Sequence, residues 1–420
     1  MESRKDSQDG AEGAAMTVSL IKSSTPTLAG SDSLSLVSPL IEDAAPGAHR
    51  DGHEVYAEQD SLIAFESEPL SDKVIGLREW GAGRVFSLRS PRHSREAAAA
   101  DAVALQLARG DLANATDRIE IVYESQSWRV KDWSRLSNLK QDGRPTREVS
   151  LMPGTEVTIA GRTFIAESPR SIALRNFCSR LLGWNDDRIA VVDHALRAIR
   201  LASAGRAPLM LTGSGDLVPT AHAIHRYSLG DRVPFVVADP RRRNTSATVR
   251  SPANCTSGVD ALRKAHGGTL CVRARRLPRD FGEILAAFRE PEYPTQLMIC
   301  YQRTLLPNAA QIDIPSLDSR RSDLPRLVSE YIEDAAHALH APDDCLDAQD
   351  ISWILDHAAF GGELTLSGIE KAALRAVALK ITGDLTGAAK LLGMARVSLE
   401  RWIKRRNEVS LNSARETDRE

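Results

Sequence analysis

The sequence has no long hydrophobic run and few cysteines, and both absences narrow the classes of protein it can encode. No apolar stretch approaches the about 18 residues that cross a bilayer, and residues 1–10 are charged, without the apolar core of an export signal. The 5 cysteines stand far apart without paired spacing, which argues against a zinc site and a disulfide framework. We therefore expect a cytoplasmic protein that binds neither membrane nor metal.

The sequence also lacks a strong net charge. Its 420 residues carry a formal charge of −2, so any contact with nucleic acid has to come from a local basic patch. Apolar residues make up 42% and charged residues 26% of the chain, as in ordinary globular proteins. This length and composition allow two or three domains with full hydrophobic cores.

Shifts in composition predict a multidomain chain. Residues 1–70 are rich in Ser, Asp, Glu, Ala and Gly, which predicts a disordered tail. Short β-branched and aromatic segments between turn residues predict an all-β antiparallel sandwich over 71–168. Helical stretches alternating with apolar strands predict a parallel α/β domain over 169–345. Short helices then predict an all-α domain over 346–408, and 409–420 is a polar tail.

The all-α region carries the most specific pattern in the chain. One helical face is predicted by apolar residues four apart, at Ile369, Ala373 and Val377. Gly383 ends that helix, and Asp384 or Thr386 can cap the next one. Gly393 supplies a tight turn before a third helix, whose inward residues are Leu399 and Ile403.

The outward face of the third helix is basic, and its exposed side chains are Arg396, Ser398, Arg401, Lys404 and Arg405. Two short helices joined at a glycine, the second basic, can place that second helix in the major groove of DNA. Lys and Arg neutralise phosphates, and side chains near the helix start reach base edges. The simpler alternative is a helical hairpin with a solvated basic face.

This segment resembles the Fis-type helix-turn-helix that ends many bacterial enhancer-binding regulators. The positions that match the family pattern are Gly383, Ala388, Ala389, Leu392, Gly393, Met394, Arg396, Ser398, Leu399, Ile403 and Lys404. Asp384 replaces the usual Asn at a cap, and Glu400 adds a negative charge to the recognition helix. The resemblance implies binding to double-stranded DNA as a homodimer, with the first helix in the dimer contact.

The α/β region resembles the AAA+ module of sigma-54-dependent activators. The resemblance lies in 221–225, in Pro234 and Phe235, in the GGTL strand at 267–270 and in the segment from Ile314. That family binds ATP on a phosphate loop followed by an acidic pair, and it contacts the sigma factor through a further loop.

The groups that the ATPase chemistry needs are missing here. The loop reads GSGDLVPT, without the Lys that contacts the β- and γ-phosphates, and with Asp216 and Pro219 where phosphates and free N–H groups are required. Arg273 and Ala274 replace the acidic pair, and the sigma-contacting loop is too short. We therefore expect no enzyme and no nucleotide cofactor. His222 and His225, three apart on a helix without further ligands, are expected to pack rather than bind metal.

The sandwich region resembles a forkhead-associated (FHA) domain. The turn and core positions of that pattern are held by Trp128, Asp132, Asp142, Gly143, Leu151, Gly154, Val157, Ile159 and Gly161. The phosphothreonine site of the family is only partly kept. Arg95 retains its first Arg, Ala115 and Arg118 replace its Ser and His, Arg135 replaces the next Ser, and Ser137 replaces its Asn. Arg118 and Arg135 can still offer an anion site of different geometry.

Two functions remain open at this point. The first is a DNA-binding transcriptional regulator without ATPase activity, in which the FHA-like domain senses a protein partner, phosphorylated or not. The second is an FHA-type interaction or scaffold protein of a phosphosignalling pathway with vestigial DNA binding. Binding of duplex DNA by the basic face of 396–406 discriminates between them, and its salt dependence identifies phosphate contacts.

Overall fold

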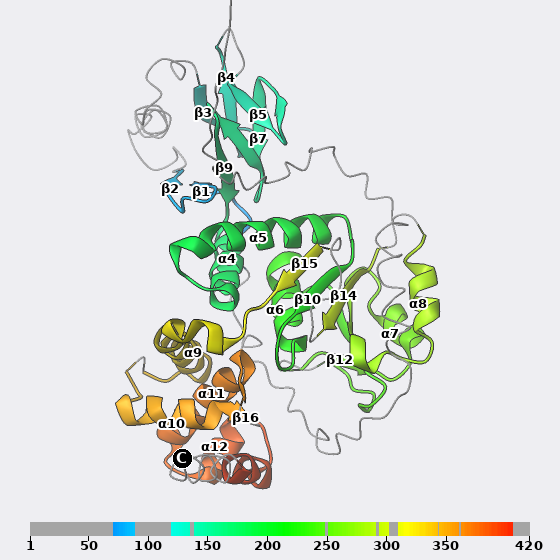
Figure 1. Ribbon diagram of the computed structural model, residues 1–420, viewed down its shortest axis with the longest axis vertical. Coiled ribbons are helices and arrows are strands. Elements are labelled where there is room, and N and C mark those ends of the chain that lie inside the picture. The colour runs from blue at the N-terminus through cyan, green and yellow to red at the C-terminus, as the bar shows by residue number, and fades with distance from the viewer. Residues whose placement is uncertain are drawn as a thin grey trace, which may run out of the picture.

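We describe the protein from a computed structural model, shown as a ribbon in Figure 1. The residues that the structure describes are 70–88, 119–134, 138–247, 251–290, 294–301, 310–342, 344–360 and 363–405. The tail predicted over 1–70, apart from its last residue, and the tail predicted over 409–420 lie outside these ranges. None of the helices in the described ranges has the length and apolar character needed to cross a membrane.

The first folded region is a sandwich of two antiparallel sheets. One sheet has the strand order β2-β1-β9-β8-β5-β6, and the other has the order β3-β4-β7. The strands are β1 (Gly76–Glu79), β2 (Val85–Ser87), β3 (Ile119–Glu124), β4 (Ser127–Asp132), β5 (Leu139–Gln141), β6 (Arg144–Pro145), β7 (Glu148–Leu151), β8 (Glu156–Ile159) and β9 (Arg162–Glu167). The sequence predicted this β-region, and the structure adds the hairpin of β5 and β6.

Alternating burial explains why these segments form a sandwich. Along β4 the side chains of Trp128 and Val130 are buried and their neighbours are half-exposed, the period of two expected for a strand with one covered face. They meet Val157, Ile159 and Phe164 of the other sheet in one hydrophobic core. The alternation in the sequence therefore encodes which face of each sheet turns inward.

The second region is a six-stranded parallel sheet with the order β12-β11-β13-β14-β10-β15. Its strands are β10 (Leu209–Thr212), β11 (Phe235–Ala238), β12 (Ala253–Cys255), β13 (Thr269–Arg273), β14 (Gln296–Tyr301) and β15 (Ala310–Asp313). Every residue of β10 and β11 is buried, as expected for a parallel sheet covered on both faces. The sequence predicted this sheet without β12 and β15.

Helices cover both faces of the parallel sheet (Figure 1). They are α4 (Pro169–Leu182), α5 (Ile189–Ala204) and α6 (Val218–Leu229) on one face, and α7 (Gly258–Lys264) and α8 (Phe281–Ala287) on the other. Short 3-10 helices are η3 (Asp186–Arg188), η4 (Ala274–Arg276) and η5 (Leu317–Asp323). Helix α6 follows β10 directly, so the loop at 213–217 lies at the carboxyl edge of the sheet, where such folds bind their ligands.

The remaining helices form one all-α body with a single core. They are α9 (Leu324–Leu339), α10 (Ala348–Ala358), α11 (Leu366–Thr382), α12 (Leu385–Leu391) and a helix over 396–405, with a small β16 (Ala359–Phe360) and β17 (Glu363–Leu364) pair between α10 and α11. Leu327 and Tyr331 of α9 belong to the same buried cluster as Ile369 and Val377 of α11. The division predicted after residue 345 falls inside this core.

A buried ion network joins the sandwich to the α/β domain. Arg78 on β1 binds Glu167 on β9 through its Nε at 2.7 Å and Asp193 on α5 through its Nη2 at 2.5 Å. All three side chains are almost fully buried. Burial opposes the charge of Arg78, but Asp193 and Glu167 outweigh it and raise the pKa of the guanidinium. Arg175 on α4 also binds Glu167, with its Nε 2.9 Å from the carboxylate. Glu167 thus has two cationic partners, while Asp193 depends on Arg78 for compensation.

Candidate nucleic-acid interface

The residues predicted to contact DNA lie in a three-helix arrangement at the end of the described chain. Gly383 ends α11 in the left-handed conformation with φ 72°. Asp384 caps α12, because its carboxylate accepts two backbone N–H groups of the first turn at 2.7 and 2.9 Å. Gly393, with φ 66°, turns the chain toward helix 396–405. The structure thus places the turns where the sequence predicted them, with Asp384 rather than Thr386 as the cap.

The inner face of helix 396–405 is fixed by apolar and cation–π contacts. Leu399 and Trp402 are buried in the core of the all-α body. The guanidinium of Arg375 on α11 lies 4.4 Å from the ring centroid of Trp402, a contact that adds to apolar burial. The ring of Trp402 also lies near Trp353 and His357 of α10, which stack at 3.9 Å. These contacts set the orientation of the helix.

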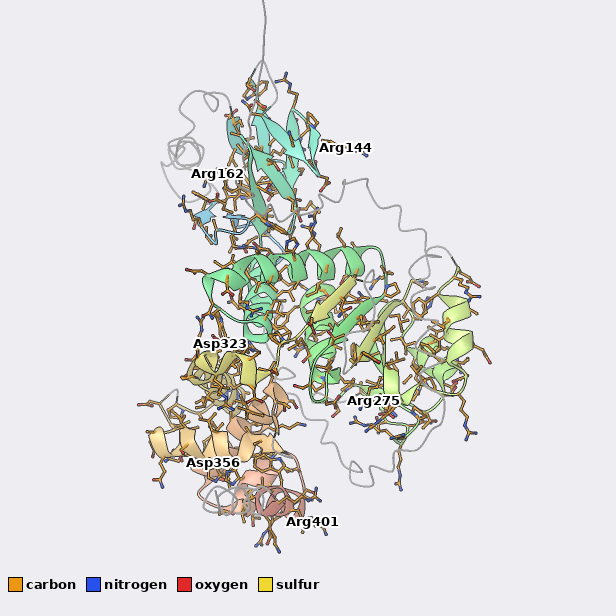
Figure 2. All side chains as sticks on the ribbon, viewed as in Figure 1. Arg144, Arg162, Arg275, Asp323, Asp356 and Arg401 are labelled. Atoms are coloured by element: carbon orange, nitrogen blue, oxygen red, sulfur yellow. The ribbon has the colours of Figure 1, made fainter. Side chains whose placement is uncertain are left out.

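The outer face of the same helix is exposed and cationic. The predicted DNA-binding residues are all exposed: Arg396, Ser398, Arg401, Lys404 and Arg405. Figure 2 shows Arg401 at the outer end of the all-α body. Residues 396–405 carry four cationic side chains and one acidic side chain, that of Glu400. This surface can neutralise phosphates, and the first turn of the helix can approach base edges.

Helix α11 is enclosed by its own chain. Residues 372–378 are all buried, which covers about two helical turns on every side. Helices α9 and α10 pack against α11 in the shared core. The resemblance implied that this helix lies in a dimer contact. In this chain the central part of α11 has no exposed face to offer one, so a two-fold contact would have to use other residues.

An ion pair occupies the loop that resembles a phosphate loop. The guanidinium Nη2 of Arg273, at the end of β13, lies 2.9 Å from both carboxylate oxygens of Asp216. Its Nη1 lies 2.9 Å from Asp239, which follows β11. Arg242 and Arg276 approach the same carboxylates at 3.5 to 3.6 Å. Burial alone would raise the pKa of Asp216, but Arg273 and Arg242 outweigh it and lower that pKa.

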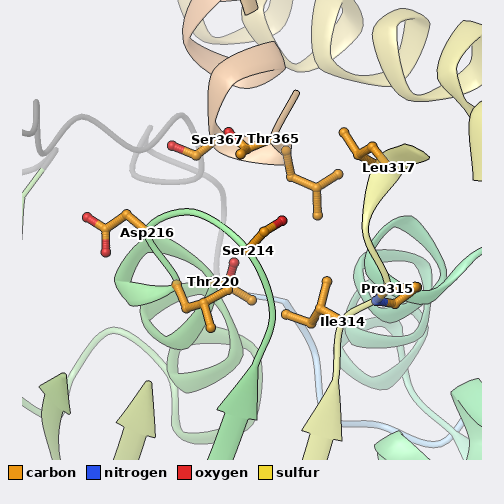
Figure 3. A pocket seen from close by; sticks show the side chains of 10 residues that line it. Ser214, Asp216, Thr220, Ile314, Pro315, Leu317, Thr365 and Ser367 are labelled. Carbon is orange, nitrogen blue, oxygen red and sulfur yellow. The ribbon is translucent and has the colours of Figure 1, made fainter. Parts of the chain in front are cut away.

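The space above this loop is small because α11 begins there. Figure 3 shows Thr365 and Ser367, at the start of α11, facing the loop that carries Ser214 and Asp216. The enclosed volume is about 20 Å³, enough for about one water, whereas small-molecule pockets usually measure about 300 Å³ or more. A methyl group added at Gly215 would lie 3.0 Å from Thr365 Cγ2. The loop and the start of α11 are therefore in direct contact.

The two histidines of α6 pack inside the α/β domain. Nδ1 of His225 lies 2.8 Å from Thr269 Oγ1, and its Nε2 lies 3.2 Å from the Val233 carbonyl oxygen. His222 lies against the ring of Phe235. Burial lowers the pKa of each imidazole to about 4. Within the described residues no group of three or more His, Cys, Asp or Glu side chains is placed to hold a metal ion.

The predicted phosphopeptide-binding residues of the sandwich lie outside the described residues: Arg95, Arg118, Arg135 and Ser137. The structure does describe the buried Asp132, which precedes Arg135 and Ser137 in the chain. Its carboxylate accepts the backbone N–H of Ser134, Asn138 and Leu139 at 2.8, 2.7 and 3.2 Å. Burial alone would raise the pKa of Asp132, but these hydrogen bonds outweigh it and lower the pKa. Asp132 thus binds residues on both sides of 135–137, the segment that contains two of the four predicted positions, Arg135 and Ser137.

The sequence interpretation missed two features of this region. It assigned Leu399 and Ile403 to the inner face of the last helix, but Trp402 is more deeply buried than the half-exposed Ile403. Trp402 lies three residues after Leu399, a helical spacing that could have revealed it. It also treated Asp216 and Arg273 as two independent departures from the ATPase pattern. Their opposite charges, on two loops at one edge of the sheet, could have predicted that they form an ion pair.

Comparison with known proteins assigns no family to this chain. No protein-family model matches the chain, and no curated protein matches it. Two solved structures of NtrX from Brucella abortus, one of them in complex with ATP, are similar to it at 14% sequence identity. The match covers 56% of this chain and 72% of NtrX, with TM-scores of 0.31 and 0.32. A likeness of this degree carries no argument about the family or the activity of this chain.

Proposed function

We propose that this chain is a DNA-binding transcriptional regulator in which the α/β domain is a scaffold and not an ATPase. The observation that carries the proposal is helix 396–405, whose inner face is fixed by Leu399 and Trp402 while its outer face presents four exposed cationic side chains. A basic helix held rigidly behind a short turn suits insertion into a major groove. The overall charge of −2 makes such a local patch the source of any attraction to DNA.

The scaffold role of the α/β domain is supported by the chemistry of its loop. A phosphate loop binds β- and γ-phosphates with a Lys and with free backbone N–H groups. Here Asp216 lies in the loop, engages Arg273 and places a negative charge where phosphates would bind. The volume left under α11 is about 20 Å³. We propose further that the sandwich binds a protein partner, with phosphorylated segments among the candidates.

DNA binding is tested by selection followed by titration. Sheared genomic DNA is incubated with the full chain, the bound fragments are sequenced, and the affinity for a selected duplex is measured at several salt concentrations. The variant Arg396→Ala with Arg401→Ala should lower the affinity by at least about tenfold and reduce the salt slope by about two units, one for each lost phosphate contact.

A matched control removes two exposed arginines elsewhere. Arg232 and Arg289 are exposed and lie before β11 and before β14 of the parallel sheet, outside helix 396–405. The variant Arg232→Ala with Arg289→Ala should bind as the wild type does. Failure of the wild type to retain any genomic fragment would remove the proposal and favour the interaction-protein alternative. Turnover of ATP by the intact chain above a no-protein blank would contradict the scaffold role.

A further inference from the structure

Two arginine-rich turns meet at the carboxyl edge of the parallel sheet. One is 241–243, which follows β11, and the other is 273–276, which begins at the end of β13, with Arg279 shortly after it. Strands β11 and β13 are parallel neighbours, with Ala238 opposite Val272. Because parallel neighbours end at the same edge, both turns lie side by side there.

The arginines at this edge form an inner and an outer set. The inner set compensates the two buried carboxylates of the loop region and consists of Arg242, Arg273 and Arg276. The outer set, here called the arginine edge, consists of Arg241, Arg243, Arg275 and Arg279. All four of these side chains are exposed, and in the described part of the chain none of them forms an ion pair or a side-chain hydrogen bond.

Four of the nearby acidic groups are already engaged, which leaves the arginine edge with a net positive charge. Asp216 and Asp239 are bound by the inner arginines. Asp260 pairs with Arg263. Asp280 accepts the backbone N–H groups of Gly258 and Val259 and the Ser257 hydroxyl. Four unpaired guanidinium groups on one exposed edge repel one another, a cost that an external polyanion would relieve.

The arginine edge is structurally connected to the DNA-binding region. Asp216, which binds inner arginines, is in the loop where Gly215 meets Thr365 at the start of α11. The 17 residues of α11 span about 25 Å before the recognition region begins. Figure 2 shows Arg275 and Arg401 on the parts of their domains that point away from the sandwich. A duplex repeats its groove about every 34 Å along its axis, so its backbone extends beyond the segment that helix 396–405 would contact.

We propose that the arginine edge binds the phosphate backbone of the same DNA duplex, outside the segment contacted by helix 396–405. This inference rests on the proposed function and names a second contact that it does not require. DNA fits better than a small anion, because a small-molecule site needs convergent groups in a concave pocket, whereas these four side chains are exposed along two turns. The phosphates of a DNA backbone lie in a row, so arginines distributed along two turns can contact several of them at once.

The test compares two duplexes that contain the same selected site. One has about 14 base pairs, little more than one helical turn, and the other extends it on both sides to about 40 base pairs. The wild-type full chain should bind the long duplex about tenfold or more tightly, with a salt slope steeper by about two to four units. The variant Arg241→Gln, Arg243→Gln, Arg275→Gln and Arg279→Gln should lose this difference and keep the affinity for the short duplex.

A control variant and a footprint complete the experiment. Arg232 and Arg289 are exposed arginines that lie before β11 and before β14, at the opposite edge of the sheet. The variant Arg232→Gln with Arg289→Gln should keep the dependence on duplex length. Hydroxyl-radical footprinting of the wild-type complex, which needs no variant, should show backbone protection beyond the site.

The outcomes separate this inference from the proposed function. Equal salt slopes of the wild type on both duplexes, or a footprint confined to the selected site, would overturn the arginine-edge contact and leave DNA binding by helix 396–405 intact. Absence of binding to the short duplex would instead count against the proposed function. If the control variant lost the dependence on duplex length equally, the inference would also be overturned, because the removal of any two arginines would then have the same effect.

Discussion

His222 and His225 show how burial sets the chemistry of single residues in this chain. Both belong to α6, and His225 is held by Thr269 and the Val233 carbonyl. Burial disfavours the charged imidazole, so both pKa values fall from 6.5 to about 4. Asp216 follows the opposite pattern, because Arg273 and Arg242 outweigh its burial and favour the charged form. Among these three groups, Asp216 keeps its charge because guanidinium groups compensate it.

The histidine pair predicts a pH-dependent stability. Between about pH 4 and 6.5 the unfolded chain binds protons that the folded chain does not, so stability rises with pH across this window and is fully present above it. Lowering the pH from 7 to 5 should therefore reduce the free energy of unfolding by about 2–4 kcal/mol through these two groups. Urea denaturation at both pH values measures the change.

The control for this prediction compares how stability changes with pH, and not the stability at a single pH. The variant His222→Gln with His225→Gln is expected to be less stable at every pH, because it loses packing against Phe235 and the bond to Thr269. Its stability should nevertheless change less between pH 5 and 7 than that of the wild type. An unchanged slope in the variant would show that other groups titrate in this window.

At the scale of elements, the turns of the C-terminal region depend on a few residues with defined backbone roles. Asp384 satisfies two N–H groups at the start of α12 that the helix itself cannot satisfy. Gly383 and Gly393 adopt the left-handed conformation that glycine tolerates without a steric penalty. Helix 396–405 follows directly, so its position relative to α12 is set by this short segment.

Removal of the cap should loosen α12 locally. The variant Asp384→Ala should cost about 1 kcal/mol, since a lost N-cap typically costs about 0.5–2 kcal/mol. The variant Thr386→Ala is the matched control, because the Thr386 backbone N–H, and not its side chain, takes part in the cap. Hydrogen exchange of the α12 amides should be about fivefold faster in the first variant and unchanged in the second. Equal exchange in both would argue against the cap.

Much of this architecture could be predicted from the sequence, because most elements have a clear hydrophobic period. Long helices such as α5 and buried strands such as β11 were predicted in this way. The short strands β12 and β15 were missed, since their three and four residues include polar side chains and no resolvable period. These segments form strands because a neighbouring strand offers backbone hydrogen bonds, and the sequence does not display that neighbour.

The candidate site was predictable to a different degree in its two parts. All five residues predicted on the outer face of the last helix are exposed, because helical period alone assigns a face. The arginine edge depends instead on β11 and β13 being neighbours, although β12 lies between them in the chain. Strand order in a sheet is a long-range property, so the two arginine-rich turns could not be joined from sequence spacing.

At the scale of the whole molecule, direct contacts connect each region to the next. The ion network of Arg78, Glu167 and Asp193 joins the sandwich to α5. The contact between Gly215 and Thr365 joins the loop to α11. An event at the sandwich therefore has a physically continuous route to the C-terminal helices.

Removing the central charge of the ion network should separate the domains. The variant Arg78→Met leaves Glu167 and Asp193 buried without their shared cation, which should cost about 3–5 kcal/mol. Differential scanning calorimetry should then resolve the sandwich as a separate, earlier transition. Neutralising all three groups with Arg78→Met, Glu167→Gln and Asp193→Asn should restore much of the loss. A single, unshifted transition in Arg78→Met would contradict this role.

The enclosure of α11 has a consequence for the spacing of DNA sites. A DNA-binding helix on a flexible linker can reach two half-sites over many separations. A helix packed in a shared core, as 396–405 is here, can rotate only together with the whole domain. If two copies read one operator, insertion of about half a helical turn between the half-sites would turn the second groove to the far side of the duplex. The packed core would resist the rotation that the second copy needs to reach that groove. The spacing between half-sites should therefore be fixed.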